Sequence, residues 1–215
     1  HLGWSGNHHV RVEEQFTGRA YAQLGELFLP GEMLLEPGQA YKSPILYGAS
    51  TDKGLSALSG AFHRHVRAKL TDRRIANKIR PVHFNTWEAV YFDLSLERLC
   101  TLADHAREVG AERFVLDDGW FKNRKSDNAG LGDWAVDKTI FPAGLAPLIN
   151  HVHYNDMEFG LWVEPEMVNP DSDLYRAHPD WVLNTQPAPL LSARNQLVLD
   201  LTRVEVQDYL FERLD

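Results

Sequence analysis

The sequence is short of cysteine, of positive charge and of long apolar runs. Cys100 is the only cysteine among its 215 residues, so no disulfide can form within one chain. A reducing, cytoplasmic location is therefore the default expectation. No apolar stretch approaches the roughly 20 residues that a membrane-spanning helix requires. The start of the chain, HLGWSGNHHV, also lacks the basic and apolar regions of a signal peptide. We expect no membrane partner.

The charge balance argues against nucleic acid as a partner. The chain has 22 basic and 30 acidic residues, giving a formal net charge of -8. A general nucleic-acid binder would present a basic face to the phosphates. With 44% hydrophobic and 24% charged residues, the composition is that of an ordinary globular protein.

Several common catalytic signatures are absent too. There is no GxSxG elbow for a nucleophilic serine and no glycine-rich phosphate loop, and we expect no cofactor. Among the ten histidines, the pairs His63/His65 and His151/His153 lie on predicted helices, where a spacing of two places side chains on different faces. A third pair, at positions 8 and 9, lies in a probable loop. We expect no metal site.

The first part of the chain divides into two segments. Residues 1–48 contain strand-like runs at 10–16 and 40–48 with Pro-Gly turns between them, and they are too few for an independent β domain. We interpret them as the end of a larger β-sandwich. Residues 49–79 form a connecting helix, predicted from apolar residues at helical spacing: Leu55, Leu58, Phe62 and Val66.

From residue 80 to 215 the pattern alternates between strand and helix. The predicted strands are PVHFNTW, FVLDDGW and FGLWVEPEMV, and the predicted helices are SLERLCTLADHAREVG, GLAPLINHVHYNDM and TRVEVQDYLFERLD. Ser95 is the expected N-cap of the first helix and Gly110 its end, while Thr202 and Glu205 form a capping-box pattern for the last. Such alternation predicts parallel strands joined by right-handed crossovers.

Two α/β architectures have this alternation, the doubly wound sheet and the (β/α)8 barrel. No glycine-rich turn follows the first strand, as a doubly wound nucleotide-binding sheet would often have. Polar clusters do follow three strands, in NTWE, DDGW and WVEPE, and barrels carry their sites on that face. We therefore predict a partial (β/α)8 barrel. Its 136 residues hold about three strand–helix units, against about 250 residues for a whole barrel.

The stretch FVLDDGWF places Asp117 and Asp118 side by side at the end of a buried strand. Adjacent like charges repel there, so something must compensate them, and a bound ligand is one candidate. Carboxylates next to aromatic residues at strand ends are typical of sugar sites. The combinations are Asp117 and Asp118 with Trp120, Glu88 with Trp87, and Glu164 and Glu166 with Trp162. The alternative is that these acids cap helices or pair with arginines.

Two further residues have plainer interpretations. Cys100 lies on the apolar face of its predicted helix and is expected to pack there rather than act as a nucleophile. Arg194, in LSARNQLVLD, is on pattern alone a surface arginine in a loop.

Taken together, the motifs WSGNH, RPVHFNTWEA, FVLDDGWF, GLWVEPEMVNP and LVLDLTR resemble glycoside hydrolase family 36, the α-galactosidases of raffinose and melibiose breakdown. The resemblance covers essentially the whole chain. It implies a large N-terminal β-sandwich domain, a (β/α)8 barrel and a C-terminal β domain, with an α-galactoside oligosaccharide as substrate and a homo-oligomeric full-length protein.

The resemblance also implies roles for particular residues. Asp117 and Asp118 match the acidic pair that accepts hydrogen bonds from the galactose 4- and 6-hydroxyls. Trp87 and Trp162 match aromatic residues lining the galactose subsite, and Arg194 matches an arginine of that subsite.

The family's retaining mechanism uses two aspartates. The nucleophile lies in a Lys-Trp-Asp motif, and neither that motif nor the acid/base motif is present. We expect both C-terminal to Asp215, so no catalytic residue is assigned and this chain alone is expected to be inactive. Two alternatives stay open: a non-catalytic galactose-binding remnant, and a different barrel glycosidase that uses Glu164 or Glu166. An isolated partial barrel is also expected to self-associate through its unpaired third strand.

Overall fold

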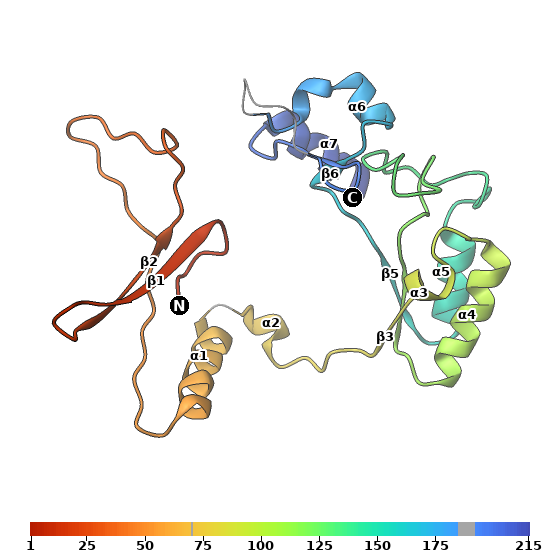
Figure 1. Ribbon diagram of the computed structural model, residues 1–215. Helices are drawn as coiled ribbons and strands as arrows, with labels where there is room; N and C mark the ends of the chain where they lie inside the picture. The colour runs from red at the N-terminus through yellow and green to blue at the C-terminus, as the bar shows by residue number, and fades with distance from the viewer. Residues whose placement is uncertain (70, 185–191) are drawn as a thin grey trace. The chain divides into compact units, whose positions relative to one another are not determined.

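The computed structural model describes residues 1–69, 71–184 and 192–215 (Figure 1). The chain divides into two compact units, His1–Lys78 and Ile79–Asp215. The division falls next to the predicted start of the third segment at residue 80. Each unit is described by itself, and the candidate site lies in the second.

The first unit contains an antiparallel hairpin and two helices. Its elements are β1 (His8–Glu14), β2 (Ala20–Glu26), α1 (Leu55–Lys69) and α2 (Arg73–Ala76). The hairpin pairs Glu14 with Ala20 at its closed end and His8 with Glu26 at its open end. Both predicted Pro-Gly turns are present, because Glu32 N–H donates to the Leu29 carbonyl, and the same bond recurs in the second turn between Gln39 and Glu36.

One strand expected in this unit was wrong and another was missed. Residues 40–48 form no strand; their only pairing is a single bridge between Leu46 and Leu2. Pro44 interrupts this run, and its ring nitrogen has no N–H to donate. The partner of β1 is instead β2, whose sequence AYAQLGE has no β-branched residue and gave no strand signal of its own.

The second unit is built around a parallel sheet of three strands. The strands are β3 (His83–Asn85), β4 (Arg113–Leu116) and β5 (Glu158–Leu161), in the order β3-β4-β5. After β3 comes the short helix α3 (Trp87–Val90), and the crossovers carry α4 (Leu96–Glu108) and α5 (Ala146–Tyr154). Figure 1 shows α4 and α5 side by side, and α5 also contacts β5. The predicted alternation and mixed α/β content are confirmed.

Helix α4 forms as its sequence predicts. The Ser95 side chain accepts a hydrogen bond from the Arg98 N–H, which caps the first turn. Gly110 has a φ of 89° just beyond the last turn, a conformation that costs glycine little. Leu99 and Ala103, on the predicted apolar face, are fully buried. The local sequence therefore determines both ends of this helix.

The core of the second unit lies where this helix and α5 meet the sheet. Phe114 and Leu116 of β4 are fully buried, and the Phe84 ring of β3 stacks on Phe114 at 5.5 Å. Leu148 and Val152 of α5 are buried as well. Cys100 packs against this core, and burial raises the pKa of its thiol, as expected for a packing residue.

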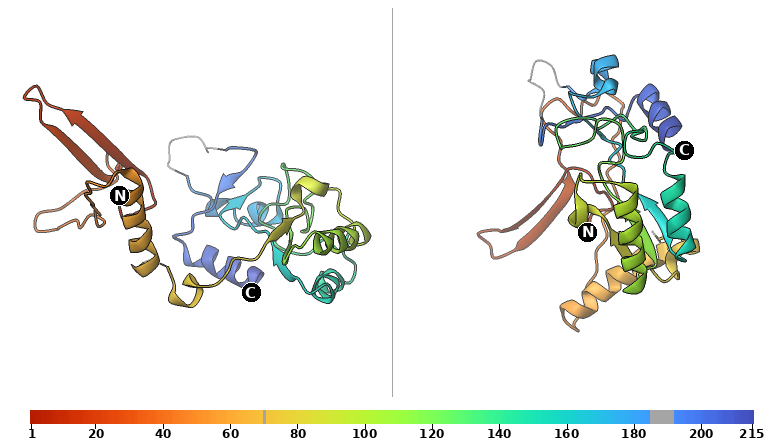
Figure 2. Two further views of the ribbon diagram at one scale, coloured as in Figure 1. Left: turned by 90° about the horizontal axis from the view of Figure 1, so that it is seen from below. Right: turned by 90° about the vertical axis from the view of Figure 1, so that its right-hand side faces the viewer.

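After β5 the chain forms a smaller group of elements (Figure 2). They are β6 (Met167–Val168), α6 (Asp173–Ala177), the 3-10 helix η1 (Pro179–Trp181), β7 (Leu197–Val198) and α7 (Val204–Leu214). β6 and β7 pair antiparallel. The segment FGLWVEPEMV, expected as one strand, is therefore two strands separated by a connection that contains Pro165.

The last helix begins later than its capping-box pattern suggested. Arg203 occupies the N-cap position of α7 and makes no side-chain capping bond. The Thr202 hydroxyl donates to the Asp200 carboxylate at 2.6 Å instead. The predicted capping box of Thr202 and Glu205 was wrong, because Asp200 also accepts, at 3.1 Å, the Thr202 N–H that the Glu205 side chain would bind in such a box.

Candidate substrate-binding site

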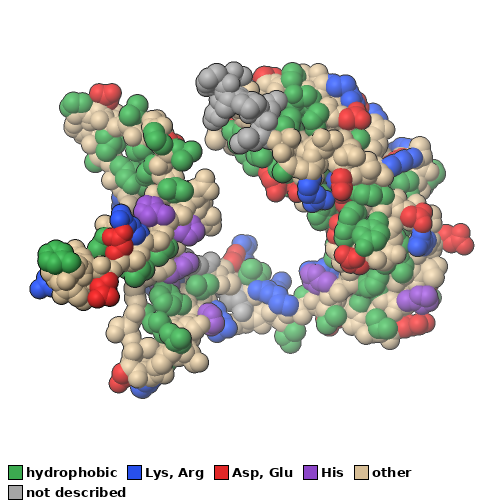
Figure 3. Space-filling view, viewed as in Figure 1, with side chains coloured by type: hydrophobic (Ala, Val, Ile, Leu, Met, Phe, Trp, Pro, Cys, Tyr) green, Lys and Arg blue, Asp and Glu red, His purple; other side chains and the backbone are tan. Residues whose placement is uncertain are grey.

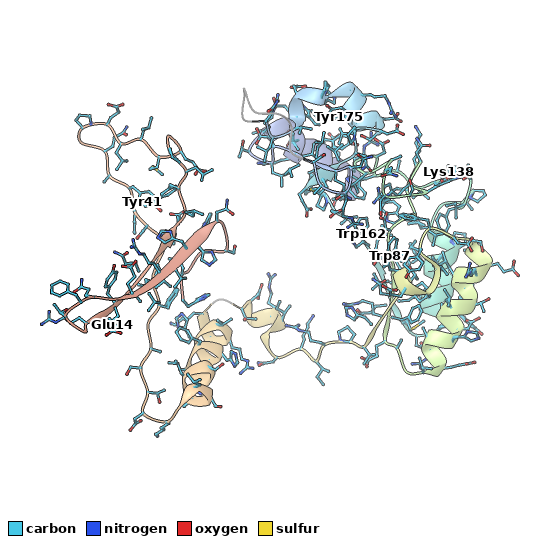
Figure 4. The ribbon with its side chains drawn as sticks, in the orientation of Figure 1. Glu14, Tyr41, Trp87, Lys138, Trp162 and Tyr175 are labelled. Carbon is cyan, nitrogen blue, oxygen red and sulfur yellow. The ribbon has the colours of Figure 1, made fainter. Side chains whose placement is uncertain are left out.

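The carboxyl ends of the three parallel strands bring several predicted residues to one edge of the sheet. The Thr86 N–H donates to the Val115 carbonyl at 3.1 Å, and the Trp162 N–H donates to the Leu116 carbonyl at 2.9 Å. Trp87 and Trp162 therefore flank the segment that follows β4, and Figure 4 shows both at this end of the sheet. The acidic pair lies in that segment, as the strand-end pattern predicted.

Asp117 is half-buried and is held by neutral groups. Its N–H donates to the Thr86 hydroxyl at 3.0 Å. Its carboxylate accepts from the Asn85 side chain and, at 2.7 Å, from the Asp118 N–H. Hydrogen bonds from neutral donors orient this carboxylate without cancelling its charge.

Asp118 has a different environment, because Arg124 binds it in a buried ion pair. The Arg124 Nε and Nη2 atoms donate to the two carboxylate oxygens at 2.9 and 2.8 Å, and the side chains are 1% and 7% exposed. The compensation that the sequence required therefore comes from within the chain. The sequence interpretation passed over Arg124; its one signal was a basic residue six positions after the acidic pair.

Asn169 is a second buried residue that the sequence did not reveal. It is fully buried, and its amide is saturated with hydrogen bonds. It accepts from Arg124 Nη1 and the Leu131 N–H, both at 3.0 Å, and donates to the carbonyls of Asp127 and Asn195 at 3.1 and 2.8 Å. One side chain thus joins the loop after β4, the end of β6 and the turn before β7.

Arg194 lies on that turn. Arg194 and Asn195 have φ angles of 52° and 59° between the paired residues Ala193 and Gln196, the arrangement of a two-residue hairpin turn. The Arg194 side chain is 64% exposed and donates to the Asp127 carboxylate at 3.2 Å. Figure 3 shows acidic and basic side chains next to one another over β6. This exposure agrees with the interpretation of Arg194 as a surface arginine in a loop, which was made from sequence pattern alone.

The aromatic residues differ in their availability. Trp87 is half-buried and meets the rings of Tyr91 and Phe92 edge-on, each at 5.1 Å. Trp162 is also half-buried, and its carbonyl accepts from the Trp120 indole N–H at 2.9 Å. Trp120 itself is 4% exposed, so it cannot serve as the stacking platform that its position beside the acidic pair suggested.

The two glutamates after Trp162 also differ. Burial raises the pKa of the Glu164 carboxyl, and the negative charge of Glu166 adds to this, while the positive charge of Arg194 opposes it. Gln196 donates to Glu164 at 3.4 Å. Glu166 is exposed. Glu164 is therefore close enough to the charges of the site to be affected by them, but it is not part of the buried Asp118–Arg124 ion pair.

The positions of the histidine pairs and the lengths of the helices are known for the described residues. The pairs His63/His65 and His151/His153 lie on α1 and α5 as predicted, and His151 contacts Asp104 at 2.7 Å. Within the described ranges, no three acidic, histidine or cysteine side chains gather as a metal site would require. None of the helices in the same ranges has the length and apolar character needed to cross a bilayer.

Comparison with known proteins gives consistent matches along the chain. The sequence profile of the melibiase family matches residues 40–215. An α-galactosidase of Escherichia coli is 46% identical over 213 residues, which are 99% of this chain and 30% of that protein.

Solved structures agree. The GH36 α-galactosidase AgaB of Geobacillus stearothermophilus has a TM-score of 0.88 at 41% identity, over 99% of this chain and 30% of its own. AgaA of the same organism, in a variant solved with raffinose, has a TM-score of 0.87 at 40% identity, over 98% and 29%. The chain thus spans about 30% of the length of these relatives. With a family match over most of its residues, the chain belongs to the melibiase family.

Proposed function

We propose that this chain is part of a retaining α-galactosidase and contributes part of the subsite for a terminal α-galactose. The observation that carries the proposal is the acidic pair at the carboxyl end of β4, flanked by Trp87 and Trp162. Asp117 keeps a charged carboxylate that neutral donors orient. Relatives from Escherichia coli and Lactobacillus acidophilus are named α-galactosidases.

The chemistry of the pair suits galactose. Charged acceptors make strong hydrogen bonds, and an axial 4-hydroxyl and the neighbouring hydroxymethyl group can reach one pair of carboxylates together. An epimer that points its 4-hydroxyl elsewhere leaves a polar group of the site unpaired. A site with such a group discriminates between sugars more strongly than an apolar pocket does. The half-buried rings of Trp87 and Trp162 offer apolar faces to a sugar ring. We place Arg194 in the same subsite.

We also propose that residues 80–215 form a partial (β/α)8 barrel. The sequential order β3-β4-β5 supports it, because neighbouring strands of a barrel follow one another along the chain. We assign residues 1–48 to the end of a β-sandwich domain and residues 49–79 to the connecting helix. The β5 edge would then pair with the next barrel strand of a longer protein.

The proposed activity also needs a nucleophile and an acid/base. We propose that the nucleophile and the acid/base aspartates belong to regions of the full-length relatives beyond the matched segment, and that Glu164 and Glu166 support the site. One relative was solved with raffinose and another with stachyose, so α-galactoside oligosaccharides are the proposed substrates. Homo-oligomeric assembly and a cytoplasmic location stay predictions.

The experiment compares Asp117→Asn with wild type in the full-length protein that carries this chain. Hydrolysis of p-nitrophenyl α-galactoside and of raffinose should fall about 100-fold, since a lost hydrogen bond to a charged group costs about 1.5–3 kcal/mol. The control is Asp156→Asn. The Asp156 side chain is exposed and lies just before the start of β5, at the end of the strand away from the acidic pair. Equal activity of wild type on α-glucosides, or an unaffected Asp117→Asn, would refute the proposal.

The raised pKa of Glu164 favours one rival function, a glycosidase that uses this residue as its own catalytic acid. Glu164→Gln in the full-length protein separates the two. A retained rate excludes the rival for this residue, whereas a loss of hydrolysis with binding intact supports it. Calorimetry with galactose and glucose tests the other rival, a binding protein without hydrolysis.

A further inference from the structure

Four charged residues, three from the loop after β4 and one from the turn before β7, alternate in sign across the candidate site. Asp118 pairs with Arg124 at 2.8 Å, Arg124 lies 3.9 Å from Asp127, and Asp127 lies 3.2 Å from Arg194. The two ends of this series are residues expected to bind galactose. The two middle members, Arg124 and Asp127, have no role in the proposed substrate contacts.

Arg124 is fixed far more rigidly than an ion pair alone requires. Besides binding Asp118, its Nη1 atom donates to the Ala129 carbonyl at 3.1 Å and to Asn169 at 3.0 Å. Its guanidinium lies over the rings of Phe92 and Phe121, at 5.7 and 5.8 Å from their centroids. Hydrogen bonds in the guanidinium plane and rings beside it leave the group no other orientation.

Asp127 is placed by the same network. Its carbonyl accepts from the buried Asn169 amide, and that amide also holds the Asn195 carbonyl on the Arg194 turn. The Asp127 carboxylate then binds Arg194, whose long side chain is otherwise exposed. A free arginine side chain loses rotamer entropy when it is ordered. Because contact with Asp127 already orders Arg194, part of this entropy is lost before substrate binds.

We propose that Arg124 and Asp127 are positioning residues that hold Asp118 and Arg194 in one fixed geometry for the sugar. The inference rests on the proposed function and deepens it. Arg124 acts through Asp118, by fixing both carboxylate oxygens, and Asp127 acts through Arg194. Such a shell matters because a displacement of about 1 Å at a binding group can cost on the order of 100-fold in rate.

The first test is a double-mutant cycle in the full-length protein between Arg124→Lys and Asp118→Asn. Lysine keeps the charge but loses the bidentate geometry. We expect Arg124→Lys to lower kcat/KM for p-nitrophenyl α-galactoside about 100-fold. In the Asp118→Asn background it should have little further effect, because the group it positions is already altered. Additive losses in the cycle would overturn a role through Asp118.

The second test keeps the proposal falsifiable if Arg124→Lys fails to fold. Asp127 is 45% exposed, so Asp127→Asn should fold normally. It should raise KM about fivefold with kcat nearly unchanged, the size of one exposed ion pair. With Arg194→Ala already present, Asp127→Asn should change KM no further. An unchanged KM, or an equal loss in both backgrounds, would overturn the role of Asp127.

Wild-type activity separates the possible failures. A wild-type protein that does not hydrolyse the α-galactoside refutes the proposed function and the inference with it. An active wild type with additive cycles refutes the inference alone. Asp156→Asn serves as the matched control in both cycles, since it removes a carboxylate at an exposed position near the opposite end of β5.

Discussion

Replacement of Arg124 by methionine should destabilise the second unit strongly. Methionine has a similar length and fits an apolar site, but it cannot neutralise Asp118. Both side chains of the pair are almost completely buried, at 1% and 7% exposure. Removing one partner of such a pair leaves an uncompensated buried charge, which costs about 3–5 kcal/mol.

The structure also divides this cost into parts. Arg124 donates to the Ala129 carbonyl and to Asn169, and losing each of these bonds costs about 1 kcal/mol. The rest comes from the charge of Asp118. The double variant Arg124→Met with Asp118→Asn removes that charge as well, so it should recover about 1–3 kcal/mol relative to Arg124→Met alone.

Urea unfolding followed by tryptophan fluorescence measures these differences. Five of the six tryptophans of these 215 residues lie in the second unit, so the signal of the isolated chain, diluted to limit its expected self-association, reports mainly on the unit that contains the pair. The comparison requires equal m values, because a changed slope indicates a different unfolded or native state. A loss below about 1 kcal/mol for Arg124→Met, or no recovery in the double variant, would contradict a buried and charged pair.

Three further outcomes are expected. Glu164→Gln should flatten the pH dependence of Tm above the ordinary glutamate pKa. The raised folded pKa of Glu164 means that its stabilisation is complete below the ordinary glutamate pKa and is lost as pH rises through the raised value, so an unchanged Tm profile would contradict this. Ser95→Ala should cost about 1 kcal/mol in urea unfolding through the lost cap, and no loss would show that α4 does not need it. Gly130→Ala should destabilise the protein more than Gly144→Ala, although both glycines have a positive φ. An added Cβ at position 130 would meet backbone at 2.7 Å, whereas at position 144 it would meet nothing within 4 Å. Equal losses of stability measured in urea would refute the clash.

The regular elements of the second unit could be predicted because their signals are local. Helix α4 carries its cap, its apolar spacing and its terminating glycine within one segment, and the structure has all three. The strands β3 and β4 run directly into polar residues that mark their ends. Prediction failed for strands that depend on a partner from another segment. β2 and β7 pair with strands elsewhere in the chain, and their own residues do not reveal the partner.

The candidate site was predictable only in part, for the same reason. The position of Asp117 and Asp118 follows from the rule that parallel strands bring their carboxyl ends to one edge. The partners of the pair do not follow from it. Arg124 is six residues away in a loop, and Asn169 lies beyond β5, so their meeting depends on how that loop folds back.

The sequence by itself determined the alternating α/β pattern, the family and the location of an acidic pair at a strand end. These features rest on periodicity, caps and motifs that each lie within a few residues of one another. The tertiary structure alone decided which carboxylate is neutralised, that Trp120 is buried, and that Asp127 and Asn169 connect Asp118 with the Arg194 turn. Burial and ion pairing are properties of residues distant in the chain, so only the folded arrangement fixes them.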